Sequence, residues 1–271
     1  MKTVRSFICE MKQIVISMPF LVSCMIVTIL EFTAGFYLTG DGKELSILEV
    51  LISFSREDME KNVLFSSFAA FESGVGSWLK LFVPIIATLP FVALFRDETS
   101  TGYRRFRIVS EGKVRYCMVK ILTCFFSGAL TLTIGTLLFS LMTGIFFPSV
   151  QQFDKESIHL ILAPYGTNSI ALIMLCQFLM IFLYGGFWGS ICLGLVGAVK
   201  NKYLIVGIPF MLKYMWQQYI DKIDGMGPDT LLYAFQEKNS IFGILIVYGI
   251  ILAISVLVFL VAMGRKEDIG V

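Results

Sequence analysis

Residues 96–120 read RDETSTGYRRFRIVSEGKVRYCMVK, a polar loop that is too short to be a catalytic domain but whose residue types could bind another protein. The stretch mixes arginines with aromatic side chains, a combination that is enriched where proteins bind one another. A purely topogenic role for the arginines would explain the charge but not the aromatics. We therefore expect this stretch to be a docking surface for another protein.

A helix that begins near Thr99 or Ser100 would organise this surface. Its 3.6-residue period gathers three side chains on one face, namely Tyr103, Phe106 and Arg107. Arg104 and Arg105 then face elsewhere. A second helix is expected to begin after Gly112.

Three ionisable residues lie inside or at the ends of strongly apolar segments, namely Glu31, Lys80 and Lys213. Such residues are functional candidates by default, because an isolated charge is costly in a bilayer. Glu31 and Lys213 could pair with each other or with Lys80 as a structural feature. They could also line a polar substrate route, or serve a membrane-embedded enzyme or an ion-coupled carrier.

No other pattern indicates catalysis, a metal site or a cofactor bound by this chain. The single histidine, His159, has no evident metal-ligand partners, and the six cysteines form no CxxC pair. The sequence also lacks the GxxxxGK[ST] segment of a nucleotide site. We expect no catalytic residues, no metal ligands and no nucleic-acid binding.

The apolar composition of the chain predicts that these residues are carried by membrane-spanning helices. Of 271 residues, 56% are hydrophobic and 15% charged, and the mean hydropathy is +0.80. A soluble enzyme is thereby nearly excluded. We expect an all-α membrane protein in one unit, residues 1–271, with six transmembrane helices at about 14–37, 78–95, 121–147, 170–199, 203–219 and 241–263.

The distribution of basic residues predicts the orientation. With both termini cytoplasmic, the inner segments carry 14 basic and six acidic residues, and the outer segments seven basic and 13 acidic. Residues 1–13 are expected to form an amphipathic surface helix, with Val4, Phe7, Ile8 and Met11 on its apolar stripe.

Two outer segments are expected to hold short extracellular helices. Within residues 38–77, one apolar face is predicted from Leu45, Leu48, Leu51 and Ile52. Residues 221–240 are expected to form a turn followed by a short apolar helix.

The chain resembles the permease subunits of type-2 ATP-binding-cassette (ABC) exporters. In that family the loop after the second span reads as an acid, a glycine four residues later, a short helix, a turn, an arginine and a lysine. This chain supplies that order with Glu98, Gly102, Ser110, Gly112, Arg115 and Lys120, although the arginine lies about one residue further from the glycine. The six-span layout resembles the family over the whole chain.

The resemblance implies that residues 96–120 hold a cytoplasmic coupling helix, which docks on a separate ATPase subunit. The contact would be carried by Glu98, Gly102, Tyr103, Arg104, Arg105, Phe106 and Arg107, while Gly112 and Arg115 would shape the return into the membrane. ATP and Mg would bind to that partner, not to this chain. The implied substrate is hydrophobic or amphipathic, such as a peptide antibiotic, a drug or a lipid, and the implied location is the bacterial inner (plasma) membrane.

The family commonly pairs two permease chains, identical or different. The spacings Gly185/Gly189 and Ser190/Gly194 would allow close helix approach. They could form the seam of such a dimer or pack helices within one chain.

Overall fold

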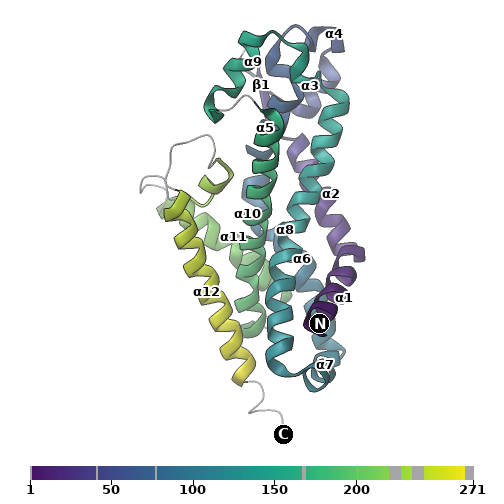
Figure 1. The fold of residues 1–271 in the computed structure, drawn as a ribbon, viewed down its shortest axis with the longest axis vertical. Coiled ribbons are helices and arrows are strands. Elements are labelled where there is room, and N and C mark those ends of the chain that lie inside the picture. Colours follow the sequence, from purple (N-terminus) through teal and green to yellow (C-terminus); the bar gives the residue numbers. More distant parts are fainter. Residues whose placement is uncertain are drawn as a thin grey trace.

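The protein is described by a computed structural model that covers residues 2–40, 42–76, 78–166, 169–199, 201–219, 227–233 and 241–265. Its long helices run side by side as an elongated bundle (Figure 1). They are α1 (Lys2–Ile16), α2 (Met18–Phe32), α6 (Trp78–Ser100), α8 (Lys113–Phe146), α10 (Ile170–Ala198), α11 (Lys202–Tyr219) and α12 (Ile241–Arg265).

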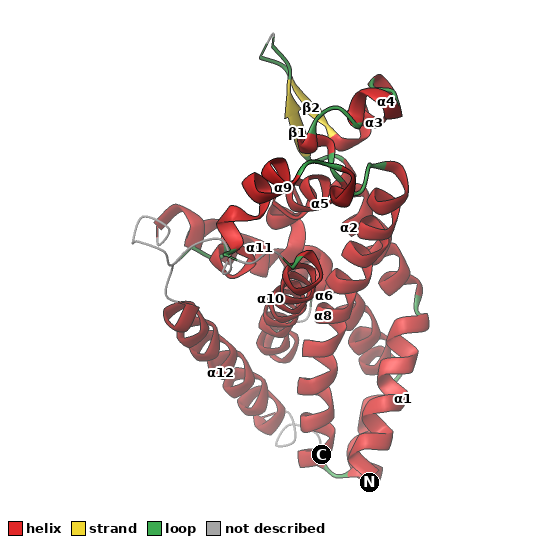
Figure 2. Cartoon of the chain, turned by 45° about the horizontal axis from the view of Figure 1, so that its top comes forward, coloured by secondary structure: helices red, strands yellow, loops and turns green. Residues whose placement is uncertain are grey.

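Shorter elements connect these helices. They are β1 (Gly35–Leu38), β2 (Glu44–Ser46), α3 (Ile47–Ser53), α4 (Arg56–Met59), η1 (Val63–Phe65), α5 (Ser67–Gly76), α7 (Tyr103–Glu111), η2 (Val150–Gln152), α9 (Lys155–Leu162), η3 (Ala163–Tyr165) and η4 (Thr230–Tyr233). The antiparallel hairpin β1–β2 projects with α3 and α4 from one end of the bundle (Figure 2), which we call the hairpin end. Helix α7 lies at the opposite end, the α7 end, together with the start of α1 and the last turns of α12 (Figure 1).

Four helical segments of the described chain are long and apolar enough to cross a membrane: α6, α8, α10 and the part of α12 from Leu245 to Gly264. Large apolar side chains remain exposed along their surfaces. On α12 they recur at Ile246, Ile250, Ile254 and Leu257, each more than half exposed. This is a surface suited to lipid, and the protein is accordingly a helical membrane protein.

The prediction of a single first span over residues 14–37 is wrong. Helix α1 continues to Ile16, the chain bends by 60° at Ser17, and α2 ends at Phe32 before strand β1 begins. Pro19 explains the break, because its ring nitrogen cannot donate the next hydrogen bond of a continuous helix. Together α1 and α2 could count as one broken span.

The predicted fifth span, residues 203–219, forms α11 but does not reach the apolarity of the other four. Pro209 and Lys213 both lie inside it. Its 18 residues rise about 27 Å, which is slightly less than the thickness of a bilayer core.

The outer segments differ from their predicted helical faces. At the hairpin end Leu45 belongs to β2, and α3 buries Ile47 and Val50 while Ile52 is 78% exposed. A capping box at Ser46 and Glu49 starts α3 at Ile47, two residues after the first residue of the predicted stripe. Of residues 221–240, only 227–233 are described, with η4 as a 3₁₀ turn; the remainder of that prediction lies outside the described residues.

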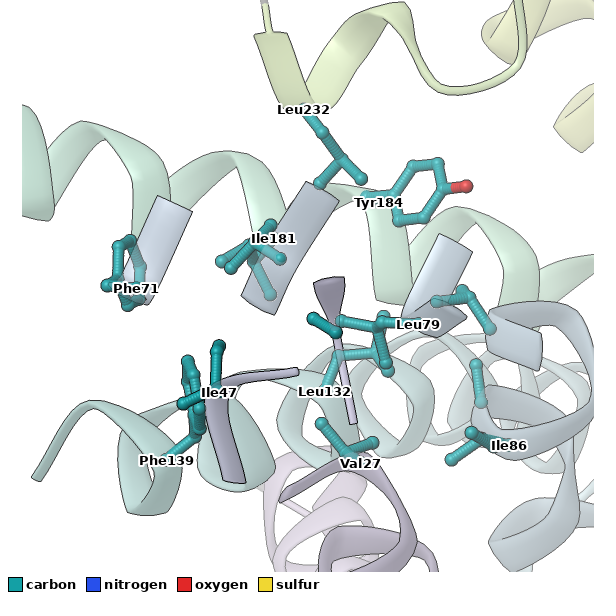
Figure 3. Close-up of a cluster of buried hydrophobic side chains, with 14 of the residues drawn as sticks. Val27, Ile47, Phe71, Leu79, Ile86, Leu132, Phe139, Ile181, Tyr184 and Leu232 are labelled. Atoms are coloured by element: carbon teal, nitrogen blue, oxygen red, sulfur yellow. The ribbon is translucent and has the colours of Figure 1, made fainter. Parts of the chain in front are cut away.

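The main apolar core lies where α2, α5, α6, α8 and α10 meet below the hairpin end (Figure 3). In the close-up, Val27, Phe71, Leu132, Phe139 and Ile181 converge from four different helices, α2, α5, α8 and α10. The core therefore joins the hairpin end to the bundle.

Glycines set the closest helix contact. A Cβ at Gly128 of α8 would lie 2.5 Å from the carbonyl oxygen of Gly185, and one at Gly185 would lie 2.7 Å from that of Gly128. Further along α10, the Ser255 hydroxyl of α12 donates to Ser190 O at 2.9 Å and accepts from Gly194 N at 3.1 Å. Both small-residue spacings of α10 thus pack helices within this one chain.

Replacing Gly128 by leucine should force α8 and α10 apart. We expect Gly128→Leu to lower the free energy of unfolding by about 3 kcal/mol, because the new side chain meets backbone that cannot yield. The loss is measured as a lower melting temperature in detergent.

Gly144→Leu is the matched control, since Gly144 lies on the same helix with nothing within 4 Å of a Cβ there. Equal destabilisation by the two variants would contradict the assigned contact.

Candidate functional site

Two glycines define helix α7 and hold it as a separate segment. Gly102 precedes its first residue with a φ of 73°, and Gly112 follows its last residue with a φ of 85°. Both angles lie in the left-handed region, which favours glycine. Helix α6 runs on to Ser100, so the prediction that the docking helix begins near Thr99 or Ser100 is wrong. The expected second helix after Gly112 is confirmed as α8.

One face of α7 presents large side chains to the surroundings. Tyr103 is 52% exposed and Phe106 66% exposed, and their rings stack with centroids 6.0 Å apart. Val109 is 87% exposed and Arg105 is also exposed. This exposed aromatic face, defined here as Tyr103, Arg105, Phe106 and Val109, has the composition that the sequence predicted for a docking surface.

Arg107 points the other way, contrary to the prediction that it accompanies Tyr103 and Phe106. Its guanidinium is buried and pairs with Glu10 of α1, with Glu98 of α6 at 3.4 Å, and with Glu111 of α7 at 3.0 Å. Arg107 lies four positions after Tyr103, so its side chain starts on nearly the same side of the helix. Its ion pairs with buried carboxylates draw the guanidinium towards the bundle instead.

Lys120 of α8 completes the cluster, which we call the buried ion network. Its ammonium pairs with Glu10 at 2.7 Å and with Glu98. Thr123 of α8 donates to Glu10 at 2.9 Å. Four helices, α1, α6, α7 and α8, therefore meet at two carboxylates and two cations that are almost inaccessible to solvent.

The charges of the buried ion network balance one another. Burial alone would lower the pKa of the Arg107 guanidinium, but the negative charges of Glu10, Glu98 and Glu111 outweigh burial and raise that pKa above its ordinary value. Arg107 therefore stays charged. A buried cation of this kind is tolerated only while its carboxylates remain in place.

The remaining predicted docking residues have other positions. The guanidinium of Arg104 donates to the sulfur of Met263 at 2.7 Å and lies over the Phe95 ring, so Arg104 ties α7 to α12 and α6. Arg115 lines a cavity between α1 and α7. The predicted docking residues therefore occupy five kinds of position: the exposed aromatic face, the buried ion network, the two glycines at the ends of α7, the contact of Arg104 with α12 and α6, and the wall of the cavity.

Sequence reasoning missed Glu10 and Glu111. Glu10 is the only acidic residue among the first 13, and it lies off the apolar stripe of Val4 and Ile8. The buried face of α1 carries Glu10 and Ile14, whereas Val4 and Ile8 are more than half exposed. The available signal in the sequence was a single acid, Glu10, in an otherwise basic helix, which indicates a specific partner for that acid.

The intramembrane candidates do not come together as a single site. Glu31 is fully buried and accepts a hydrogen bond from Thr136 at 2.6 Å. Lys213 pairs with Asp229 at 2.7 Å, donates to the Tyr184 hydroxyl at 2.9 Å, and donates to the backbone carbonyl of Lys80. The predicted pairings of Glu31 with Lys213 or with the Lys80 side chain do not occur among the described residues.

The intramembrane clusters of Glu31 and Lys213 each join helices to one another. Within the described part of the chain, no three His, Cys, Asp or Glu side chains gather where they could hold a metal ion. Lys213 instead ties α11 to α6, α10 and the segment that contains Asp229. Glu31 and Thr136 join α2 to α8 in the same way.

Comparison with protein-family models, curated proteins and solved structures finds no match to this chain.

Removing the charge of Glu10 should destabilise the protein, because it leaves the buried cations of the network incompletely paired. We expect Glu10→Gln to lower the free energy of unfolding by about 3–5 kcal/mol, because Lys120 and Arg107 would then share one buried carboxylate, Glu98, and Arg107 would keep only the more exposed Glu111 besides. Thermal denaturation in detergent measures the loss, and Glu57→Gln, an exposed acid on α4, is the control.

The double variant Glu10→Gln/Lys120→Met should recover much of that loss, because it removes one charge of each sign. Strictly additive effects of the two substitutions would contradict the pairing.

Proposed function

We propose that this chain is the transmembrane permease subunit of an ABC exporter and that α7 is its docking helix for a separate ATPase subunit. The observation that carries the proposal is the form of α7. It is a short helix between two apolar helices, it exposes aromatic and arginine side chains, and its inner side is fixed by the buried ion network.

The exposed aromatic face is suited to binding a protein. Stacked Tyr103 and Phe106 offer apolar area with little side-chain entropy to lose, and Arg105 beside them can pair with acidic groups.

The buried ion network supports a coupling role. A force on α7 acts on Arg107, and Arg107 can move away from Glu10 and Glu98 only by leaving buried charges unpaired. Movement of α7 is therefore transmitted to α1, α6 and α8. Closure of the ATPase partner would in this way change the arrangement of the bundle and move the substrate across the membrane.

A six-span arrangement follows if α2, with α1 as its surface extension, and α11 are counted beside the four apolar helices. The start of α1 and the described end of α12 both lie at the α7 end, as an even number of crossings requires (Figure 1). The excess of basic residues supports a cytoplasmic position for that end and an outer position for the hairpin end. The membrane would be the bacterial inner membrane.

The partners follow from the same proposal. ATP and Mg would be bound by the ATPase subunit, and a second permease chain, identical or different, would complete the pathway. A dimer seam would have to lie away from Gly185 and Gly194, since both already contact helices of this chain. The substrate would be hydrophobic or amphipathic, in the class of peptide antibiotics, drugs and lipids.

The docking role is tested by truncating the exposed aromatic face. We expect Tyr103→Ala/Phe106→Ala to reduce the ATPase that co-purifies with the chain at least tenfold, because central interface aromatics contribute about 2 kcal/mol each. The chain is isolated from its native membrane in mild detergent, and bound protein and ATP hydrolysis are measured.

Leu48→Ala/Ile52→Ala removes comparable exposed area at the hairpin end and should retain the ATPase. Undiminished ATPase on the α7 variant, or no ATPase on the unmodified chain, would rule the proposal out.

The orientation has its own test. Asn201 is exposed in the connection that Arg96 of α6 holds at the α7 end through the Val199 carbonyl, and Ile52 is exposed at the hairpin end. A membrane-impermeant maleimide added to intact cells should label Ile52→Cys, and should label Asn201→Cys only after the membrane is opened. The reverse pattern would place α7 outside the cell.

A further inference from the structure

A cavity of about 420 Å³ lies between α1 and α7. Its wall includes Arg5 and Cys9 from α1, Arg107 and Ser110 from α7, and Arg115 from the first turn of α8. Arg5, Cys9 and Ser110 are exposed, so the cavity is open to the surroundings. Its volume lies within the range of small-molecule sites.

The cavity has more positive than negative charge available to a ligand. Its two acids, Glu10 and Glu111, are already paired with Arg107, and Glu10 also with Lys120. Arg5 and Arg115 face the same cavity, and neither has an ion pair or hydrogen bond with the described residues. Two guanidinium groups are thus left to bind an anion.

Apolar surface leads away from both free arginines. Next to Arg115, α8 exposes Val114, Met118 and Leu122 on successive turns, at 71%, 46% and 44%. On α1, Val4 and Ile8 are 60% and 57% exposed on the turn that carries Arg5. An anion that fills this cavity therefore lies where apolar chains attached to it could run along the protein.

We propose that this cavity binds the phosphate of an anionic phospholipid, with Arg5 and Arg115 as its ligands and the exposed faces of α8 and α1 along its acyl chains. Guanidinium groups bind phosphate oxygens in pairs, and basic pockets at the ends of transmembrane helices select anionic headgroups. The proposal needs only a membrane at the level of α1, and it stands independently of an ATPase partner.

The bound lipid would also have a structural effect. It would fill the space between α1 and α7 and neutralise Arg5 and Arg115, which otherwise add positive charge beside Arg107. Binding to the folded form alone raises stability by mass action. Anionic lipid should therefore stabilise the protein, and zwitterionic lipid should not.

The test uses the full chain in detergent and three probes at equal concentrations: phosphatidylglycerol, phosphatidylcholine with the same acyl chains, and inorganic phosphate. We expect phosphatidylglycerol alone to raise the melting temperature, by several degrees at saturation. In Arg5→Gln/Arg115→Gln that increase should vanish or need at least tenfold more lipid.

Lys12→Gln/Lys202→Gln is the matched control, since both lysines are exposed cations that do not line the cavity. It should keep the full increase with phosphatidylglycerol. The arginine variant should melt like the unmodified chain in phosphatidylcholine, because Arg5 and Arg115 make no ion pair or hydrogen bond within the described part of the chain.

Three results would overturn the proposal. An equal response of the two double variants would show general attraction of anionic lipid to a basic surface. An equal increase with inorganic phosphate would identify a free-anion site. No increase with phosphatidylglycerol would show that the cavity binds no such headgroup.

Discussion

Charge neutrality at one buried point governs how the α7 end is assembled. Glu10, Glu98, Arg107 and Lys120 come from four different helices, and each is almost fully removed from solvent. None of these charges could be buried alone, because the desolvation of an unpaired ion costs several kcal/mol. Helices α1, α6, α7 and α8 must therefore come together as a set, and α7 is held to the bundle although five of its nine residues are exposed.

The remainder of the bundle is held by means suited to a lipid environment. Apolar side chains gain little by leaving lipid for protein, so close backbone contact and buried hydrogen bonds have to supply the specificity. Gly128 and Gly185 allow close backbone contact between α8 and α10. Ser255 forms a buried hydrogen bond between α12 and α10. At the hairpin end, an aromatic cluster that includes Phe36, Phe65 and Phe147 holds the connecting segments together.

The sequence was sufficient for features that depend on local apolarity. Long uncharged runs predicted α8 and α10 closely, and Gly112 marked the start of α8. Pro19 was the local sign of the bend at Ser17, but the length of the apolar run hid it. The mixture of aromatic and basic residues predicted that Tyr103 and Phe106 would be exposed. It did not predict that Arg107 would be buried, because its partner Glu10 lies 97 positions away in the sequence. Pairings over such separations leave no local pattern, and Thr136 with Glu31, 105 positions apart, is a second example.

The two left-handed glycines, one at each end of α7, fix the number of residues in this short connection. They enclose nine helical residues, and Arg107 stands at the middle of them. One inserted residue would rotate everything beyond it by about 100° and carry Arg107 or the stacked rings to the wrong side. A surface connection usually tolerates changes in length, but this one has a fixed register. Variation in related chains should therefore occur as substitutions on the outer face of α7, with the distance from Gly102 to Gly112 unchanged.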